Sequence, residues 1–261
     1  MNQWSIRRKR AALYMVLGFL IIIVGLPLYF FLHTTPTCFD KKQNGDETGV
    51  DCGGSCQLIC SAGASPIITK GDARILKVAT STFEVVVSVE NPNPTGSIKK
   101  AGYSFKIYDA TSTGPIKIIQ GKTYVPKASA FAVFEGPFDL GEVVPARVVF
   151  EWDKATLVWE KDISKPKDIK AEENTLSNVA IAPRLDASVK NFSLERATNI
   201  ELVALILDSS DSIVGASKTF VDTLEPGEST PIVFLWPRPF NDPSIHPIIF
   251  TRVLPDSSFI K

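Results

Sequence analysis

The sequence predicts an all-β protein, with two tandem immunoglobulin-like Greek-key β-sandwiches behind one N-terminal transmembrane helix and a short disulfide-rich segment. Three observations support this fold class. Residues 11–32 carry no charge, all four cysteines fall between positions 38 and 60, and the remaining chain alternates apolar and polar residues between turn signals. The expected parts are a cytoplasmic tail (1–10), a membrane anchor (11–32), a cysteine-rich collar (33–65), a first sandwich (66–162), a linker (163–174) and a second sandwich (175–261).

The uncharged stretch 11–32 is long enough to cross a membrane as a helix, because about twenty residues span a hydrocarbon core of roughly 30 Å. Four cations, at positions 7–10, precede it directly, so the positive-inside rule places the tail in the cytoplasm. The alternative is a cleaved signal peptide, whose apolar core is usually about 7–15 residues and ends at a small-x-small site. No such site follows this stretch. We therefore expect an uncleaved anchor, with the C-terminal domains in the periplasm or on the cell surface.

Composition argues against several classes of function. Basic and acidic residues balance at 28 each, so no net charge attracts nucleic acid, and we expect no nucleic-acid partner. Neither of the two histidines has a cysteine or a Gly-x-Ser-x-Gly neighbour, and no phosphate-binding glycine loop occurs. We therefore expect no enzyme activity. A surface hydrolase remains an alternative that needs convergent carboxylates.

The four cysteines, Cys38, Cys52, Cys56 and Cys60, indicate two disulfides. An even number of cysteines outside the membrane tends to oxidise, and three connectivities are possible. The alternative is a four-thiolate zinc site, but such sites usually have paired C-x-x-C knuckles, which this spacing lacks.

The segment between the first two cysteines has the spacing of a twelve-residue calcium loop, with Gly45 at the sixth position. The candidate ligands are Asp40, Asn44, Asp46, Thr48 and Asp51. Lys42 at the third position departs from that pattern. The alternative is a disulfide-pinned turn with solvated acids, in which case the protein has no cofactor.

The run NGDETGVDCGGSC at residues 44–56 resembles a short cysteine-rich element of bacterial secreted and surface proteins. This resemblance implies an extracytoplasmic location and a structural role as a stiff collar between membrane and domains. It implies no activity.

Two halves of the chain after the collar align at an offset of about 100 residues, which predicts two homologous units. The matches are Ser88–Asn91 with Ser188–Asn191, Lys122–Val125 with Lys218–Val221, and Val148–Phe150 with Ile248–Phe250. Expected strands are Arg74–Ala79, Phe83–Glu90, Gly102–Tyr108, Ile116–Tyr124, Ala130–Glu135, Ala146–Trp152, Thr156–Glu160, Leu185–Lys190, Asn199–Leu207, Ile213–Phe220, Ser229–Trp236 and Ile248–Val253. About seven strands per 100 residues is typical of a Greek-key sandwich. The charged run Lys161–Asn174 supplies the linker.

The first unit carries Phe105-Lys106-Ile107-Tyr108-Asp109 after an Asn-Pro-Asn turn, and it resembles the FxLYD family and the related late-embryogenesis-abundant type 2 sandwiches. The second unit matches through Leu205–Asp208 and the turn Leu224–Glu228. The resemblance implies immunoglobulin-like sandwiches in envelope proteins, without catalytic residues. We expect four apolar side chains to lie in the cores, namely Phe105, Ile107, Leu205 and Leu207. We expect four polar side chains to form hydrogen bonds with turn backbones, namely Asn91, Asp109, Asn191 and Asp208. Asn191 is also the first residue of a glycosylation sequon. We favour the hydrogen-bonding role in the turn over glycosylation.

The loop Trp236–Pro247 is the best candidate for a contact surface, because its prolines pre-order it and limit the entropy lost on binding. Its candidate contact residues are Trp236, Arg238 and Phe240. For Trp236 itself we favour a half-buried core role over an exposed binding face.

Together these features predict a membrane-anchored, extracytoplasmic, non-enzymatic binding or scaffolding protein of a bacterial envelope. Its partner would be another envelope protein or a surface component. The alternative is an accessory subunit of a membrane-embedded secretion or pilus-type machine.

Overall fold

The structure, a computed structural model, describes residues 3–32 and 37–255. The first four collar residues and the last six residues of the chain lie outside the described part. The chain forms two compact units, Met1–Cys56 and Gln57–Lys261, and the second is called the β unit below.

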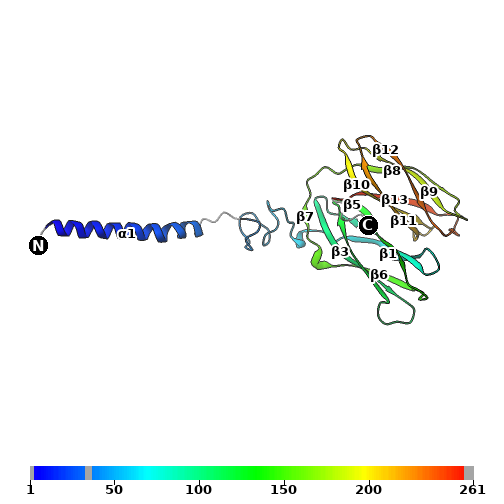
Figure 1. Ribbon diagram of the computed structural model, residues 1–261, viewed down its shortest axis with the longest axis horizontal. Coiled ribbons are helices and arrows are strands. Elements are labelled where there is room, and N and C mark those ends of the chain that lie inside the picture. The colour runs from blue at the N-terminus through cyan, green and yellow to red at the C-terminus, as the bar shows by residue number, and fades with distance from the viewer. Residues whose placement is uncertain (1–2, 33–36, 256–261) are drawn as a thin grey trace. The chain divides into compact units, whose positions relative to one another are not determined.

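Helix α1 covers Gln3–Leu32, and its segment Arg7–Tyr29 is long and apolar enough to cross a membrane (Figure 1). The mean hydropathy of this segment is 2.5, and its apolar side chains are exposed. Such an all-round apolar surface suits lipid contact. The helix begins before the expected span, so the four cations lie on its first turns. This helix could therefore anchor the protein in a membrane.

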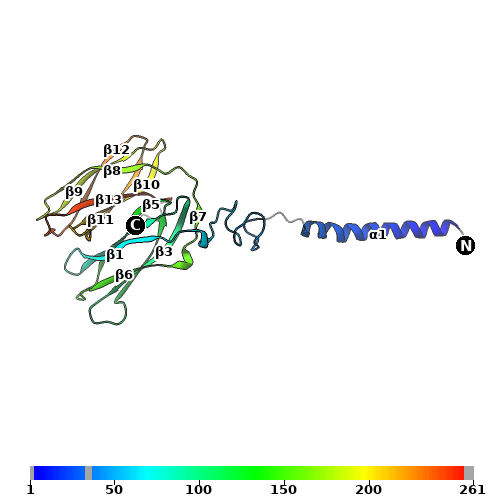
Figure 2. The same ribbon diagram turned by 180° about the vertical axis from the view of Figure 1, so that it is seen from behind.

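The β unit is built mostly of strands (Figures 1 and 2). The first half contains β1 Ile68–Lys77, β2 Thr82–Asn91, β3 Gly96–Tyr108, β4 Lys117–Val125, β5 Ser129–Asp139, β6 Arg147–Trp152 and the short β7 Glu160–Lys161, with 3-10 turns η1 Ser61–Gly63 and η2 Lys154–Thr156. The second half contains β8 Ile169–Ser177, β9 Arg184–Asn191, β10 Ala197–Leu207, β11 Ile213–Leu224, β12 Ser229–Leu235 and β13 His246–Val253.

Each half consists of two antiparallel sheets that share a core. In the first half, the sheet β1-β2-β5 faces β4-β3-β6, and β7 pairs with the start of β3. In the second half, β8-β9-β12 faces β11-β10-β13, which is the same strand order. Two sheets over one core fit a β-sandwich.

Alternation on β2 explains why this strand has one face in the first core. Phe83, Val85 and Val89 are buried, as a period of two predicts for a half-buried strand. Phe105 and Ile107 on β3 lie opposite in the same core, which confirms their predicted role.

Asn91 and Asn191 hold equivalent turns in the two halves. Each is fully buried, and each Nδ2 donates to a carbonyl four or five residues later and to a distant carbonyl, at Pro126 for Asn91 and Leu224 for Asn191. Each Oδ1 accepts the backbone N–H two residues later. Asp109 and Asp208 likewise accept turn N–H groups, so the turn role expected for all four residues is confirmed.

These equivalent contacts correct the expected alignment between β4 and β11. Because Pro126 and Leu224 play the same part, Lys122–Val125 corresponds to residues 220–223 and not to Lys218–Val221. The sequence match was misplaced by two residues because the pattern Lys-Thr-aromatic-Val occurs at both 122–125 and 218–221.

Two expected elements differ from the observed ones. The expected strand Thr156–Glu160 is the end of η2 followed by irregular chain, and only β7 is extended there. Residues 169–174 of the expected linker belong to β8 instead. This strand pairs with β9 alone, so its charged side chains can remain in water, as on many edge strands, while Ile169 is buried.

A third apolar cluster joins the two halves into one unit. It lies between the outward faces of the sheets that contain β2 and β10, and its buried members are Val86, Ala132, Phe134, Val203, Leu205, Leu207, Ile213 and Ala216. Leu205 and Leu207, which we expected in the second core, face this cluster, while Ala204 and Ile206 face the core. The reason is that successive side chains of a strand point to opposite faces.

Candidate functional site

The loop after β12 is held by Trp236, which is buried. The indole Nε1–H of Trp236 donates to the carbonyl of Ala216 at 3.0 Å, and the Phe240 ring packs edge-on at 5.8 Å between centroids. Gly215 makes room for this ring, because a Cβ at that position would lie 2.6 Å from Phe240 Cζ. Trp236 therefore supports the loop from inside, which agrees with the core role considered for it from the sequence.

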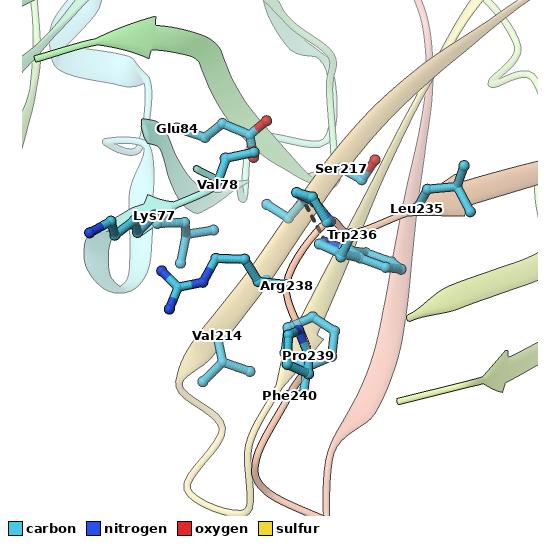
Figure 3. A pocket seen from close by; sticks show the side chains of 14 residues that line it. Lys77, Val78, Glu84, Val214, Ser217, Leu235, Trp236, Arg238, Pro239 and Phe240 are labelled. Carbon is cyan, nitrogen blue, oxygen red and sulfur yellow. Dashed lines mark hydrogen bonds between the residues drawn. The ribbon is translucent and has the colours of Figure 1, made fainter. Parts of the chain in front are cut away.

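This loop forms one wall of a groove of about 250 Å³ between the two halves (Figure 3). The second half contributes residues 214–217 and 235–240, and the first half contributes residues 76–78 and Glu84. We call this cavity the inter-half groove. Its walls come from segments at least 130 positions apart in the chain, so it exists only because the third cluster fixes the halves.

Two cations line the groove, one from each half. Lys77 ends β1, Arg238 lies in the loop after β12, and both are exposed. Within residues 37–255, neither makes an ion pair or a hydrogen bond with another side chain. In Figure 3 the two side chains extend toward the same side of the groove.

Glu84 lies on β2 at the same groove and is half-buried, and its carboxylate makes no hydrogen bond with any described residue. Burial raises the pKa of the Glu84 carboxyl to about 7, against the opposing effect of the Lys218 charge. Glu84 faces the second half because it shares its face of β2 with Val86.

Replacing Glu84 by glutamine should remove one pH-dependent component of stability. The carboxyl has a reference pKa of 4.5 and a folded pKa of about 7, so the folded state binds the extra proton and stability falls as pH rises between those values. We expect Glu84→Gln to match the parent at pH 4.5 and to exceed it at pH 8 by about 1–2 kcal/mol, after discounting for solvent screening. Thermal unfolding at both pH values measures this. The exposed Glu142→Gln is the control, and equal effects of the two variants would contradict the assignment.

Of the three predicted contact residues, only Arg238 is exposed, while Phe240 is partly buried. Sequence reasoning missed Lys77 and Glu84. The sequence does contain a signal for Glu84, because it shares the outward face of β2 with Val86. The sequence around Lys77 contains no such signal.

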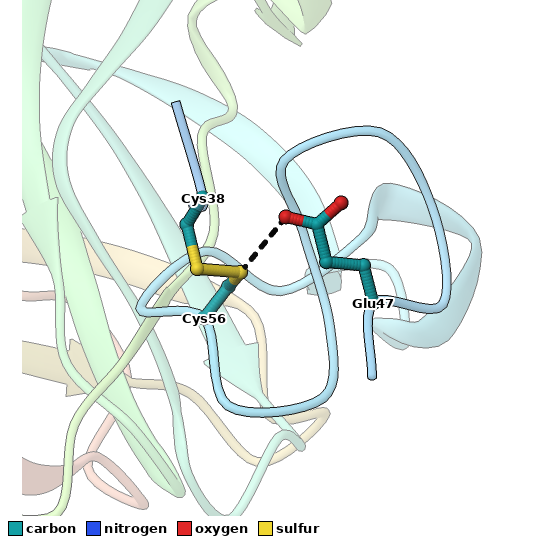
Figure 4. Close-up of side chains that lie close together, drawn as sticks. All are labelled: Cys38, Glu47 and Cys56. Atoms are coloured by element: carbon teal, nitrogen blue, oxygen red, sulfur yellow. Dashed lines mark hydrogen bonds between the residues drawn. A yellow bond between two sulfur atoms is a disulfide. The ribbon is translucent and has the colours of Figure 1, made fainter. Parts of the chain in front are cut away.

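The cysteines of the collar are oxidised, as expected. Cys38 and Cys56 form a disulfide with 5.6 Å between Cα atoms, and Cys52 and Cys60 are also disulfide-bonded. Oε1 of Glu47 lies 3.3 Å from Sγ of Cys56 (Figure 4). A disulfide sulfur is no thiolate, so these groups do not form a thiolate metal site, and the zinc alternative is excluded.

The candidate calcium ligands are engaged within their own loop. Asp40 accepts from Asn44 Nδ2 at 2.8 Å and from the Lys42 N–H, and the Asn44 hydrogen bond is the main cause that lowers the pKa of Asp40. Asp51 accepts the Lys41 N–H, and Asp46 accepts the Ser55 hydroxyl. A Cβ at Gly53 would lie 1.8 Å from Thr48 Oγ1, so Thr48 packs against the loop.

Among the described residues, the three aspartates do not converge within 4.8 Å of one another. The Oδ1 atom of Asn44 is buried and accepts no hydrogen bond from the part of the chain that the structure describes. The calcium loop stays a prediction from sequence, and calorimetry on the full chain checks it. The prediction expects a calcium-dependent heat that Asp40→Asn abolishes and Asp72→Asn leaves intact. Absence of heat from the parent chain at millimolar calcium would contradict it.

Fold and site define a disulfide-containing, mostly β protein whose N-terminal helix could anchor it in a membrane. No protein-family model matches the sequence, and no curated protein matches it. Among solved structures, the chain is similar to the crystal structure of red sea bream transglutaminase, with a TM-score of 0.26 and 11% identity over 71% of this chain. The chain spans 29% of that structure's chain.

Proposed function

We propose that the protein is a membrane-anchored, extracytoplasmic, non-enzymatic binding or scaffolding protein that presents two immunoglobulin-like Greek-key sandwiches to another envelope protein. The observation that carries this proposal is the inter-half groove, whose two cations make no ion pair with described residues. The disulfides support an oxidising extracytoplasmic compartment. The helix supports attachment to the membrane, and the cations on its first turns support an N-terminus in the cytoplasm.

The strand order supports the immunoglobulin-like description. In both halves, the first, second and fifth strands face a sheet in which the third strand lies between the fourth and sixth. The corresponding immunoglobulin strands are A-B-E on one sheet and C′-C-F on the other. The shared order, with the shared asparagine turns, supports two copies of one unit.

Site-specific photo-crosslinking of the full chain in its native membrane tests this function. A photoreactive residue is placed, one position at a time, at the exposed apolar positions Ile118, Val144, Ile181 and Val214. We expect at least one position to give a discrete adduct with an envelope protein. An absence of adducts at all four positions would overturn the proposal.

A helix exchange separates binding by the β unit from the alternative machine subunit. Residues 3–32 are replaced by an unrelated single span of the same length and orientation. A binding or scaffolding protein keeps its adduct, because its contacts lie in the β unit. Loss of the adduct with normal membrane insertion would instead favour a machine subunit whose helix makes the contacts.

A further inference from the structure

We propose that the inter-half groove binds an acidic, extended segment of the partner protein, with a carboxylate of that segment held between Arg238 and Lys77. This inference rests on the proposed function and adds the chemistry of the partner. Three features of the groove lead to it: its charge, its size and its apolar rim.

The charge of the groove favours an anion. Lys77 and Arg238 line it, one from each half, and Lys218 lies close enough to act on the Glu84 charge. Among the described residues, Glu84 is the one acidic residue that lines the groove, so the local balance is positive in a chain whose total charge is zero. A guanidinium can hold a carboxylate through two parallel hydrogen bonds, and an ammonium adds a point charge.

The size of the groove favours part of a larger partner over a free metabolite. Its volume of about 250 Å³ is below the range of about 300–1,000 Å³ that is typical of small-molecule sites. Such a volume accommodates one or two side chains.

The rim of the groove favours a protein segment over inorganic phosphate or a lipid headgroup. Val214 is 37% exposed and Leu235 is 61% exposed, and Pro237 and Pro239 extend the surface. Apolar side chains beside paired cations match a segment in which apolar residues flank an acidic one. The prolines limit the entropy that the loop loses on binding.

Glu84 makes binding of an acidic segment depend on pH. The charged residues that line the groove with it are Lys77 from β1 and Arg238 from the loop after β12, and Lys218 from β11 acts on its charge. An ionised Glu84 repels a bound carboxylate, whereas a protonated Glu84 can donate a hydrogen bond to it. Binding should therefore weaken as pH rises through about 7, the pKa of Glu84 in the folded chain.

The test uses full-length protein in its native membrane, with the photoreactive residue at Val214. We expect the adduct to map by mass spectrometry to an acidic segment of the partner. Arg238→Glu and Lys77→Glu should each reduce its yield at least tenfold, while Lys122→Glu, an exposed cation outside the groove, leaves it unchanged. Replacing the mapped acidic residue of the partner by lysine should restore the adduct to the Arg238→Glu chain.

The proposal is overturned if the Val214 adduct maps to a segment without acidic residues, maps to lipid, or is insensitive to both charge reversals. It is also overturned if Ile118 or Val144 gives a protein adduct and Val214 gives none, a result that leaves the proposed function standing. The adduct yield is also measured at pH 6 and pH 8, because a purely structural role of Glu84 would not make the yield depend on pH. We expect the yield to fall at pH 8 in the parent and to stay level in Glu84→Gln.

Discussion

Replacing Arg252 by alanine is expected to lower the free energy of unfolding of the β unit by about 3–5 kcal/mol, the cost of breaking a buried ion pair. Arg252 and Glu201 are both 7% exposed, and the guanidinium donates to Glu201 from Nε and Nη2. Its Nη1 also donates to the Tyr124 carbonyl at 2.7 Å, and the group lies 4.6 Å from the centre of the Phe131 ring. The variant leaves the Glu201 charge buried without its partner, at the boundary between the halves.

Urea denaturation measures this effect, and two controls define its cause. Arg184→Ala removes a surface pair with Asp186 and should cost at most about 1 kcal/mol. The double variant Arg252→Met with Glu201→Leu should recover most of the loss, because two apolar side chains leave no buried charge. An Arg252→Ala change below 1 kcal/mol would contradict the buried role of the pair.

Replacing Asn191 by alanine is expected to cost the β unit about 2–4 kcal/mol, because several buried polar groups lose their partners at once. The amide donates to the carbonyls of Glu195 and Leu224 at 2.9 and 3.0 Å and accepts the Ser193 N–H. Asn91→Ala should have an effect of similar size for the same reason. Thermal or urea unfolding of the purified protein measures both.

Ser193→Ala is the matched control for Asn191, since it keeps the side-chain contacts of Asn191 with all three backbone groups. It should cost less than half as much free energy of unfolding as Asn191→Ala.

The same geometry predicts that the Asn191 sequon stays unmodified in the folded protein, because Nδ2 is buried and donates both of its protons. A loss below 1 kcal/mol in Asn191→Ala, or a glycan on Asn191, would contradict this account.

The elements that local pattern determines were predicted well. The buried face of β2, the core positions Phe105 and Ile107 and the turn-bonding asparagines follow from alternation and from side chains that bond their own backbone. The errors have local physical causes. β8 was mistaken for linker because an edge strand tolerates a charged outer surface.

The packing of one half on the other was harder to predict from the sequence. A signal existed in the runs of consecutive apolar residues at 85–87 and 202–207, because a strand buried on both faces loses its alternation. That signal shows that an outward face is covered, but not what covers it. The presence of Lys77 and Arg238 at one groove depends on this packing, so the sequence identified only the loop that carries Arg238.

The orientation that we propose places the β unit outside the membrane on an uncleaved, N-inside helix. Protease treatment of right-side-out membrane vesicles containing the full chain tests it most directly, with one epitope tag at each terminus. We expect the C-terminal tag to be lost without detergent, while the N-terminal tag remains on a membrane-bound fragment. Protection of the C-terminal tag until detergent is added, or recovery of a mature chain that lacks residues 3–32, would contradict it.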